Sequence, residues 1–274
     1  VKETEQKNVW LKLNDEQRRA VEGLDKAKGF SPFVLHGVTG SGKTEVYLKM
    51  MDNLFIRQPQ AQVLFLVPEI NLTPQLEERI RSHFPDRTVA SLHSGLANGE
   101  RARAWLAGHE KRIQILIGTR MAIFADLPNL ALIVVDEEHD LSYKAGDGIR
   151  YSARDLAVKL AQLQQIPVVL GSATPSLETW SQVKRGYYSL LTLTKRAVPG
   201  AVFPSLTVVN PKDKKLIKGL TPEVIDAISE TLEKKEQVII FLNRRGYAPV
   251  LTCSSCGWLS KCPHCSTYAV YHKF

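Results

Sequence analysis

The sequence has no apolar run that approaches the roughly 20 residues that a helix needs to cross a membrane. Its charged opening, Val-Lys-Glu-Thr-Glu, resembles neither a signal peptide nor a transit peptide, and no internal repeat or low-complexity tract is present. These absences argue against membrane-spanning, exported and repeat-built classes of protein. We expect a globular protein of the cytosol with no membrane partner. Because residue 1 is Val rather than Met, we also expect a piece of a longer protein.

Cysteine is absent before residue 253, and all four cysteines fall between Cys253 and Cys265. A disulfide framework for the whole fold is therefore excluded. The four form two Cys-x-x-Cys pairs, Cys253 with Cys256 and Cys262 with Cys265, and each pair can present two thiolates to a tetrahedral ion. The spacing by itself predicts one zinc site of four cysteines. His264 is an alternative ligand, although we expect it to be exposed.

Excess charge is absent from the first two thirds of the chain. Residues 1–180 contain 22 basic and 22 acidic side chains, whereas residues 181–274 contain 14 basic and 6 acidic ones. The formal net charge of +8 therefore lies entirely in the last third. A basic segment of this kind favours a polyanion such as DNA or RNA as partner, and a solvated basic face without a partner is the alternative.

Short apolar runs alternate with stretches of helical periodicity over the first 180 residues. The runs are apolar almost throughout, which is typical of strands buried on both faces of a parallel sheet. The sequence therefore predicts an α/β domain whose ligands bind at the carboxyl ends of the strands. Predicted strands cover 32–36, 62–67, 88–92, 113–117, 130–135 and 168–170, and predicted helices follow the N-cap Asn14 and cover 45–51, 74–84, 98–106 and 152–163.

Residues 37–44 match the phosphate-binding P-loop pattern G-x-x-x-x-G-K-T and lie between a predicted strand and a predicted helix. In that setting backbone N–H groups surround a phosphate at the helix N-terminus, Lys43 neutralises β- and γ-oxygens, and the Thr44 hydroxyl ligates Mg²⁺. The loop predicts ATP and Mg²⁺ as cofactors, and a glycine-rich turn without a ligand is the alternative. Its residues are Gly37, Val38, Thr39, Gly40, Ser41, Gly42, Lys43 and Thr44.

An acidic turn, Asp136-Glu137-Glu138-His139, directly follows the apolar strand 130–135. In this Walker B arrangement Asp136 is predicted to hold Mg²⁺, directly or through water, and Glu137 to orient or deprotonate the attacking water. We place all four residues at the nucleotide, with a position in the core as the alternative for His139. Together with the P-loop, the turn predicts hydrolysis rather than nucleotide binding alone, and a solvated acidic turn without a catalytic role is the alternative.

Proline and glycine interrupt the pattern near residue 199, where we place a domain boundary. Beyond it, 206–209 and 238–242 are expected to be strands, and Thr221 with Pro222 begins a predicted helix. We therefore expect four parts. They are a flexible segment at 1–10, an ATP-binding domain at 11–198, the start of a second α/β domain at 199–252 and a partial zinc-binding module at 253–274.

Several motifs together resemble one family of enzymes. Asp-Glu-x-His at 136–139 and Gly-Ser-Ala-Thr-Pro at 171–175 resemble motifs II and III of superfamily 2 helicases. The stretches 38–47, 67–75 and 241–249, the last of which leads into a Cys-x-x-Cys pair, resemble the bacterial primosomal replication-restart DNA helicases of the DExH (DEAH box) type. The resemblance covers residues 13–265. It implies an ATP-dependent enzyme with two RecA-like domains, of which this chain holds the first and the start of the second.

The resemblance also implies roles for individual residues. Gln17 would read adenine, and Ser172-Ala173-Thr174 would couple the nucleotide state to DNA contact. Aromatic rings would stack on bases and basic groups would pair with phosphates, and a plain surface loop is the alternative for the loop after the acidic turn. The residues that would face DNA are Pro68, Glu69, Thr119, Arg120, Tyr143, Lys144, Arg150, Tyr151 and Arg154.

For the intact protein, the resemblance implies 3′→5′ translocation on DNA, remodelling of stalled or abandoned forks, and primosome assembly that reloads the replicative helicase in the bacterial cytoplasm. The implied partners are single-stranded and forked DNA, primosome proteins and single-strand-binding protein. Each cysteine pair would hold its own Zn²⁺, two ions in all, with further cysteines beyond residue 274. Motifs V and VI, the latter with a catalytic arginine, would lie there too.

Three other functions are open at this point. A DNA-dependent translocase of another superfamily 2 family, in repair or recombination, is the nearest alternative, and residues 243–247 beside the cysteine pairs argue against it. A small-molecule kinase has no use for 172–174 or for a basic C-terminal part. A non-catalytic zinc-ribbon module would not need Asp136 and Glu137 beside Lys43.

Overall fold

A computed structural model describes residues 12–69, 73–146, 148–197, 205–212, 214–241, 250–251, 253 and 255–262. The chain divides into two compact units, Val1–Val202 and Phe203–Phe274. The predicted flexible segment at 1–10, Cys265 and the motif at 243–247 lie outside the described residues.

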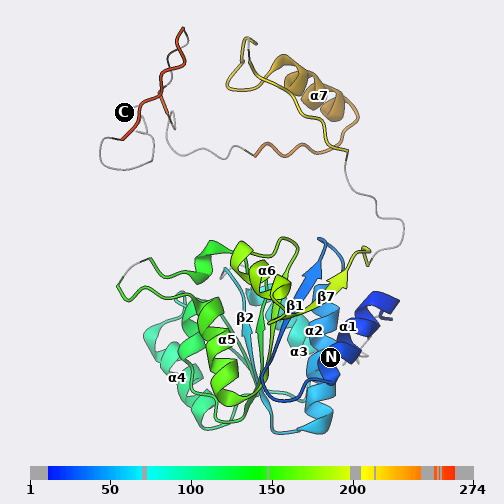
Figure 1. The fold of residues 1–274 in the computed structure, drawn as a ribbon, viewed down its shortest axis with the longest axis vertical. Coiled ribbons are helices and arrows are strands. Elements are labelled where there is room, and N and C mark those ends of the chain that lie inside the picture. Colours follow the sequence, from blue (N-terminus) through cyan, green and yellow to red (C-terminus); the bar gives the residue numbers. More distant parts are fainter. Residues whose placement is uncertain are drawn as a thin grey trace, which may run out of the picture. The chain divides into compact units, whose positions relative to one another are not determined.

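One parallel sheet forms the centre of the first unit (Figure 1). Its seven strands are ordered β3-β4-β2-β5-β6-β1-β7 within the described residues. All neighbours run in the same direction, so the segments that follow the strands gather at one edge of the sheet. The strands are β1 Ser31–Gly37, β2 Gln62–Leu66, β3 Val89–Leu92, β4 Ile115–Gly118, β5 Leu130–Val135, β6 Pro167–Ser172 and β7 Ser189–Leu193.

Helices cover both faces of this sheet (Figure 1). Three of them, α1 Asp15–Asp25, α2 Lys43–Arg57 and α3 Thr73–His83, pack on one face. Two others, α4 Asn98–His109 and α5 Ala153–Gln164, pack on the other face. Shorter elements connect the strands: the 3₁₀ turns η2 Arg120–Phe124 and η3 Leu141–Tyr143, and the helix α6 Leu177–Lys184.

The buried apolar side chains form two clusters, one on each face of the sheet, because successive residues of a strand point to opposite faces. On β2, Val63 and Phe65 join the cluster beneath α1, α2 and α3, whereas Leu64 and Leu66 join the cluster beneath α4 and α5. Every residue of β2 is buried, because helices close both faces of the sheet. The central strands therefore appear in the sequence as continuous apolar runs.

The predicted α/β class is confirmed, with two errors in the first unit. The strand predicted at 168–170 was expected to be the last strand of the sheet. A further strand, β7, follows it in the chain and pairs with β1 at the edge of the sheet. This edge strand is mostly exposed and lacks the continuous apolar run of the central strands. Helix α6 was also missed.

The second unit contains α7 Pro222–Glu233, with Thr221 at the N-cap and proline in the first turn as predicted. The strands predicted at 206–209 and 238–242 are wrong for the part of this unit that the structure describes. Leu206, Val208 and Ile239 each expose at least 86% of their surface there. A strand needs a neighbour to pair its backbone groups, and these segments have none among the described residues. The start of a second RecA-like domain therefore stays a prediction.

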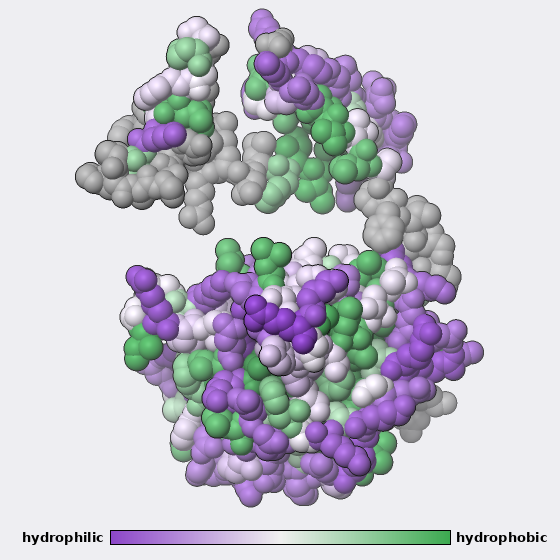
Figure 2. All heavy atoms as spheres, viewed as in Figure 1, coloured by the Kyte–Doolittle hydropathy of each residue, from purple (hydrophilic) through white to green (hydrophobic). Residues whose placement is uncertain are grey.

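Hydrophilic and apolar side chains are intermixed over the visible surface of the first unit (Figure 2). Isolated exposed apolar residues of this kind are normal for folded proteins. No helix in the described ranges is long and apolar enough to cross a membrane.

The two-sided burial of the sheet can be tested with two isoleucines. Ile117 on β4 is fully buried and Ile56 on α2 is 71% exposed. We expect Ile117→Ala to lower the free energy of unfolding by about 2–5 kcal/mol, because it leaves a cavity. Ile56→Ala should change it by less than about 0.5 kcal/mol. Urea unfolding followed by circular dichroism checks both, and equal effects would contradict the described core.

Candidate active site

The P-loop connects β1 to α2 in a conformation that only glycine accepts readily. Gly40 and Gly42 have φ angles of 76° and 77°, in the left-handed region. A Cβ atom on Gly37 would lie 2.5 Å from the Ser41 Oγ, and one on Gly42 would lie 2.5 Å from the Gln17 Nε2. The Ser41 Oγ is buried and has no hydrogen-bond partner in the described structure. A loop of this shape at a helix N-terminus fits a phosphate group.

The acidic turn faces the P-loop across the edge of the sheet. Lys43 Nζ lies 3.3 Å from the Glu137 Oε1 and donates a hydrogen bond of 3.2 Å to the Gly37 carbonyl. Glu137 has a φ of 46°, which is uncommon for a residue other than glycine. Such backbone conformations cost free energy and cluster at functional sites. The structure therefore brings the lysine and one predicted catalytic carboxylate together.

Asp136 is held from two directions. Its backbone N–H continues the sheet by donating to the Leu66 carbonyl at 2.9 Å, and its carboxylate accepts a 3.0 Å hydrogen bond from the Tyr47 hydroxyl. Burial raises the pKa of Asp136, the Glu137 charge raises it further, and the hydrogen bond from Tyr47 opposes both. A bound cation would favour the ionised form of this carboxylate.

Tyr47 itself is fully buried on α2, one turn after Thr44. Burial, followed by the Asp136 charge, raises the pKa of its hydroxyl well above the ordinary value, so it remains a donor. Tyr47 was not among the residues predicted for the site. The sequence places Tyr47 on the apolar face of its helix. That position does not distinguish a tyrosine of the core from one that hydrogen-bonds a catalytic carboxylate.

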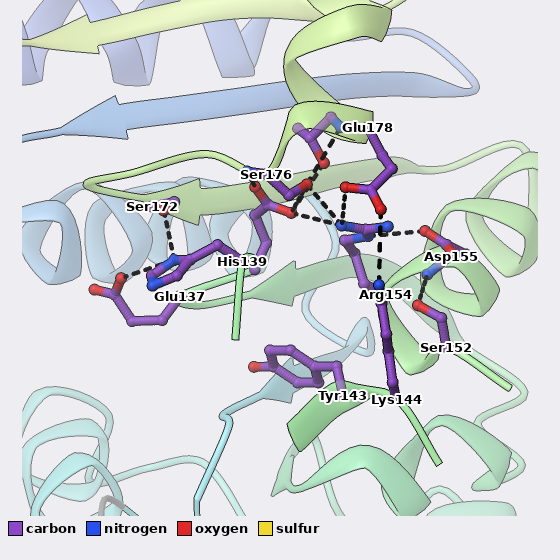
Figure 3. A network of polar contacts seen from close by, with 12 residues as sticks. Glu137, His139, Tyr143, Lys144, Ser152, Arg154, Asp155, Ser172, Ser176 and Glu178 are labelled. Carbon is purple, nitrogen blue, oxygen red and sulfur yellow. Dashed lines mark hydrogen bonds and ion pairs between the residues drawn. The ribbon is translucent and has the colours of Figure 1, made fainter. Parts of the chain in front are cut away.

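His139 connects the acidic turn to the end of β6 (Figure 3). Its Nδ1 lies 2.7 Å from the Ser172 Oγ and 3.7 Å from the Glu137 Oε2. The buried Ser172 Oγ also accepts a 2.9 Å hydrogen bond from the Thr174 N–H. Ala173 is half-buried and Thr174 is exposed. The predicted coupling segment thus lies in contact with the predicted nucleotide site.

Gln17 contacts the P-loop from α1. Its Nε2 donates to the Ser41 carbonyl at 2.9 Å, and its Oε1 accepts from the Asn14 N–H at 2.9 Å. The Asn14 side chain accepts from the Gln17 N–H in return, which closes a capping box at the start of the helix. Each end of the amide keeps one further hydrogen-bonding position. The predicted contact with adenine stays a prediction.

Glu138 is placed differently from its neighbour Glu137. Its side chain is completely buried and accepts hydrogen bonds from the Ser176 N–H at 2.7 Å, the Ser176 Oγ at 3.1 Å and the Thr179 Oγ1 at 2.9 Å. All of these donors belong to the start of α6. The Glu138 oxygens are thus bound within the protein, and the expectation that Glu138 contacts the nucleotide stays a prediction.

Arg154 is also buried. Its Nη1 lies 3.3 Å from the Glu138 Oε2 and donates to the Ser176 Oγ at 2.7 Å, and its Nε donates to the Asp155 Oδ1 at 2.8 Å. The guanidinium neutralises an acidic group inside the domain. In this position Arg154 is bound within the protein, and the expectation that it pairs with a DNA phosphate stays a prediction.

Tyr143, which was expected to stack on a base, lies in the interior in this structure, and the stacking stays a prediction. It is only 1% exposed, and its hydroxyl donates a 2.7 Å hydrogen bond to the Asp136 carbonyl. Burial raises the pKa of this hydroxyl well above its ordinary value. Within the same loop Lys144 and Arg150 are exposed, and the half-buried Tyr151 meets the Phe124 ring edge-on at 4.9 Å.

The other residues predicted to face DNA follow β2 and β4. Pro68 and Thr119 are buried, whereas Glu69 and Arg120 are exposed. The Arg120 guanidinium donates to the Lys144 carbonyl at 3.3 Å. It therefore supports the start of the loop that also carries Arg150 and Tyr151.

Three of the four cysteines lie among the described residues. No group of three His, Cys, Asp or Glu side chains in these ranges could hold a metal ion. The Cys253 carbonyl accepts a 2.9 Å hydrogen bond from the Gly257 N–H, and the Cys253 N–H donates to the Trp258 carbonyl at 2.8 Å, so the first pair lies in a tight turn. The Ser255 hydroxyl, followed by backbone N–H groups, lowers the pKa of the Cys253 thiol to about 6. A single site of four cysteines is not tested, because it requires Cys265.

The fold and this site define a class of protein. The family model of the DEAD/DEAH box helicases matches residues 14–183, and the chain belongs to this family. At the level of single proteins, it is 41% identical to replication restart protein PriA of Bacillus subtilis and 44% identical to replication restart protein PriA of Haemophilus influenzae, over 96% of this chain in each case. The chain spans 33% and 36% of those two proteins, about a third of their length. The resemblance to replication-restart helicases is confirmed.

Solved structures agree on the fold. Helicase MrfA bound to DNA and AMPPNP has a TM-score of 0.57 and 19% identity, with 85% of this chain and 34% of that chain covered. RecG bound to a three-way DNA junction has a TM-score of 0.52 and 22% identity, with 70% and 25% covered. At these identities the likeness concerns the fold alone.

The contact between Tyr47 and Asp136 depends on a glycine. A Cβ atom on Gly171 would lie 1.6 Å from the Tyr47 hydroxyl oxygen, and Tyr47 has no room to withdraw. We expect Gly171→Ala to lower the free energy of unfolding by about 1–3 kcal/mol.

Gly146→Ala is the control, because a Cβ there meets nothing within 4 Å. Tyr47→Phe removes the clashing oxygen, so Gly171→Ala with Tyr47→Phe should cost less than the sum of the two single changes. Urea unfolding of the four variants measures this, and strict additivity would contradict the contact.

Proposed function

We propose that this chain is the ATP-binding part of an ATP-dependent 3′→5′ DNA helicase that remodels stalled or abandoned replication forks. The observation that carries the proposal is the 3.3 Å approach of Lys43 to Glu137 at the edge of a helicase-family sheet. The identity of 41–44% to replication restart proteins supports the biological role. We propose the activity for the full-length gene product, because the chain spans about a third of those relatives.

ATP with Mg²⁺ fits the P-loop. Backbone N–H groups of 37–44 would hold the phosphates, Lys43 would neutralise the β- and γ-oxygens, and the Thr44 hydroxyl and Asp136 would hold the cation. Two observations support a ligand here. The buried Ser41 Oγ has no hydrogen-bond partner in the described structure, and Gly37 and Gly42 leave no room for a Cβ atom beside the loop. The cation supplies charge neutralisation at the phosphates.

Glu137 is the residue that orients or deprotonates the attacking water. It is one third exposed, so water reaches it, and Lys43 is its present partner. When phosphate oxygens replace that partner, the carboxylate becomes free to accept a proton from water. His139 and Ser172 then connect the occupied site to 172–174, which supports the coupling role of this segment.

Single-stranded DNA is the proposed substrate at the same edge of the sheet. Lys144 and Arg150 are exposed in the loop after the acidic turn and would pair with phosphates, and Tyr151 would offer a ring to a base. Glu69 after β2 and Arg120 after β4 are also exposed and would face the DNA. Fewer residues are proposed to contact DNA than the sequence predicted, because the side chains of Tyr143 and Arg154 are buried.

The wider role follows from the similarity to replication restart proteins. Fork DNA, primosome proteins and single-strand-binding protein would be the partners, and reloading of the replicative helicase in the bacterial cytoplasm would be the outcome. A repair or recombination translocase of superfamily 2 is the alternative that the identities to replication restart proteins disfavour. A kinase and a non-catalytic zinc ribbon are disfavoured by the family match.

The site geometry predicts the effect of two lysine changes on α2. We expect single-stranded DNA to stimulate the ATPase of the full-length product, and Lys43→Ala to lower the rate by about 10²-fold or more, because the phosphate charge loses its main partner. Lys49→Ala is the matched control on the same helix and should stay within about twofold. Equal rates with and without DNA would refute the helicase proposal.

The resemblance to replication-restart helicases implies two zinc ions in the full-length product, each held by one cysteine pair together with ligands further along the chain. The tight turn at Cys253 supports a zinc-binding loop at the first pair. Elemental analysis should find two ions per molecule, and replacing Cys253 and Cys256 by Ser should remove one of them. If this 274-residue chain alone binds one zinc tightly, the four thiolates form a single site and the two-ion account is wrong.

A further inference from the structure

The chain that leaves the edge strand β7 returns to the P-loop. The Val38 N–H donates a hydrogen bond to the Leu193 carbonyl at 3.2 Å, and the Ala197 N–H donates one to the Gly40 carbonyl at 2.8 Å. These two hydrogen bonds hold residues 193–197 against the loop. A segment that lies more than 150 residues further along the chain is therefore a neighbour of the phosphate-binding loop.

Glu16 on α1 holds the same segment from the other end. Its Oε2 accepts hydrogen bonds from the Thr194 N–H at 2.7 Å and from the Lys195 N–H at 3.1 Å, and its Oε1 accepts one from the Thr194 hydroxyl at 2.6 Å. The hydrogen bond from the Thr194 hydroxyl lowers the pKa of Glu16, burial opposes this, and the two backbone donors lower the pKa further. An ionised carboxylate makes stronger hydrogen bonds than a neutral acceptor, so these contacts fix the segment to α1.

Gln17 and Ala197 both lie next to Gly42 of the P-loop. A Cβ atom on Gly42 would lie 2.5 Å from the Gln17 Nε2 and 3.3 Å from the Ala197 Cβ. Glu16 and Gln17 are consecutive residues in the first turn of α1, so one turn of helix holds both the segment and the glutamine at this place. Gln17 is the residue predicted to read adenine, and its amide keeps one further hydrogen-bonding position at each end. The glutamine and the segment therefore border the same place beside the loop.

We propose that residues 194–197 form one wall of the adenine site and that Glu16 is the positioning residue that holds this wall in place. The inference rests on the proposed function, because it concerns the nucleotide that this site would bind. Adenine carries an amino donor where guanine carries a carbonyl acceptor, so backbone groups at fixed positions favour one base over the other. Glu16 acts through the backbone of the segment, and the wall discriminates only while it is held still.

Two other roles of Glu16 make different predictions. If Glu16 only stabilised the domain, its loss would lower the unfolding temperature and leave the affinity of the folded protein for every ligand unchanged. If the segment served only to shape the P-loop through Gly40, its release would weaken the binding of all phosphate ligands equally, with or without a base. A wall of the adenine site loses affinity for adenine nucleotides alone.

The test compares the full-length gene product with its Glu16→Ala variant by isothermal titration calorimetry in the presence of Mg²⁺. The ligands are ADP, GDP and tripolyphosphate, the last of which probes the P-loop without a base. We expect Glu16→Ala to raise the Kd for ADP by about fivefold or more, the effect of one lost hydrogen-bonding contact. The Kd values for GDP and tripolyphosphate should stay within about twofold. An unchanged Kd for ADP, or an equal rise for all three ligands, overturns the proposal.

Asp15→Ala is the matched control. Asp15 is the other acidic residue in the first turn of α1, and it pairs with Arg18 of the same helix at the surface. Its loss removes the same charge from the helix N-terminus and should change the Kd for ADP by less than about twofold. If Asp15→Ala weakens ADP as much as Glu16→Ala does, the charge at the helix N-terminus explains the effect and the proposal is overturned.

Thr194→Val guards against misfolding of the Glu16 variant. It removes only the hydroxyl donor to Glu16 and leaves α1 unchanged. It should raise the Kd for ADP by about two- to fivefold. Glu16→Ala with Thr194→Val should be no worse than Glu16→Ala alone, because both changes break one contact. Additive effects of the two changes would overturn the proposal.

The proposed function and this inference fail in different ways. A wild-type product that binds ADP and GDP equally has no adenine wall, which overturns the inference, and a DNA-stimulated ATPase would then still support the proposed function. An ATPase that DNA does not stimulate refutes the helicase proposal, whatever the three Kd values are.

Discussion

The parallel pairing of β1, β6 and β5 is the constraint on which the site depends. The P-loop leaves β1, the acidic turn leaves β5, and the segment 172–174 leaves the strand between them. Because parallel strands end at one edge, three motifs separated by up to about 130 residues become neighbours without any long loop. The contacts of Lys43 with Glu137 and of His139 with Ser172 follow from this arrangement.

Burial divides the charged groups of the acidic turn into two kinds. Glu137 stays partly exposed beside Lys43, where a nucleotide can displace its partner. Glu138 is sealed inside the domain, where an arginine and the donors at the start of α6 compensate its charge. The first environment suits proton transfer and the second suits rigid positioning, because a charge that is fully bonded in the interior does not exchange partners cheaply.

The proposed DNA surface and the nucleotide site share structural supports. Arg120 holds the start of the loop 144–152 through backbone carbonyls, and Tyr143 at its entrance donates to the backbone of Asp136. Arg120 and Tyr143, which the sequence placed on DNA, thus make contacts within the domain that connect this loop to the acidic turn.

The sequence by itself determined the α/β class, the P-loop, the acidic turn and the helicase family, because these depend on local patterns of glycine, charge and continuous apolar strands. Strand β7 was not predicted, because an edge strand is covered on fewer sides and contains polar residues that interrupt the apolar run. The strands expected at 206–209 and 238–242 were wrong in the described part of the second unit, because pairing needs a neighbour that local pattern does not guarantee.

Only the tertiary structure decided where each acidic side chain of the turn lies. Glu137 and Glu138 are adjacent and chemically alike, and the sequence placed both at the nucleotide. The fold separates them, because the left-handed backbone at Glu137 and donors 16 and 38 residues further along the chain direct one carboxylate to Lys43 and the other into the core. The burial of Tyr143 and Arg154 was not predicted for the same reason, since burial is a property of packing that residue type alone does not specify.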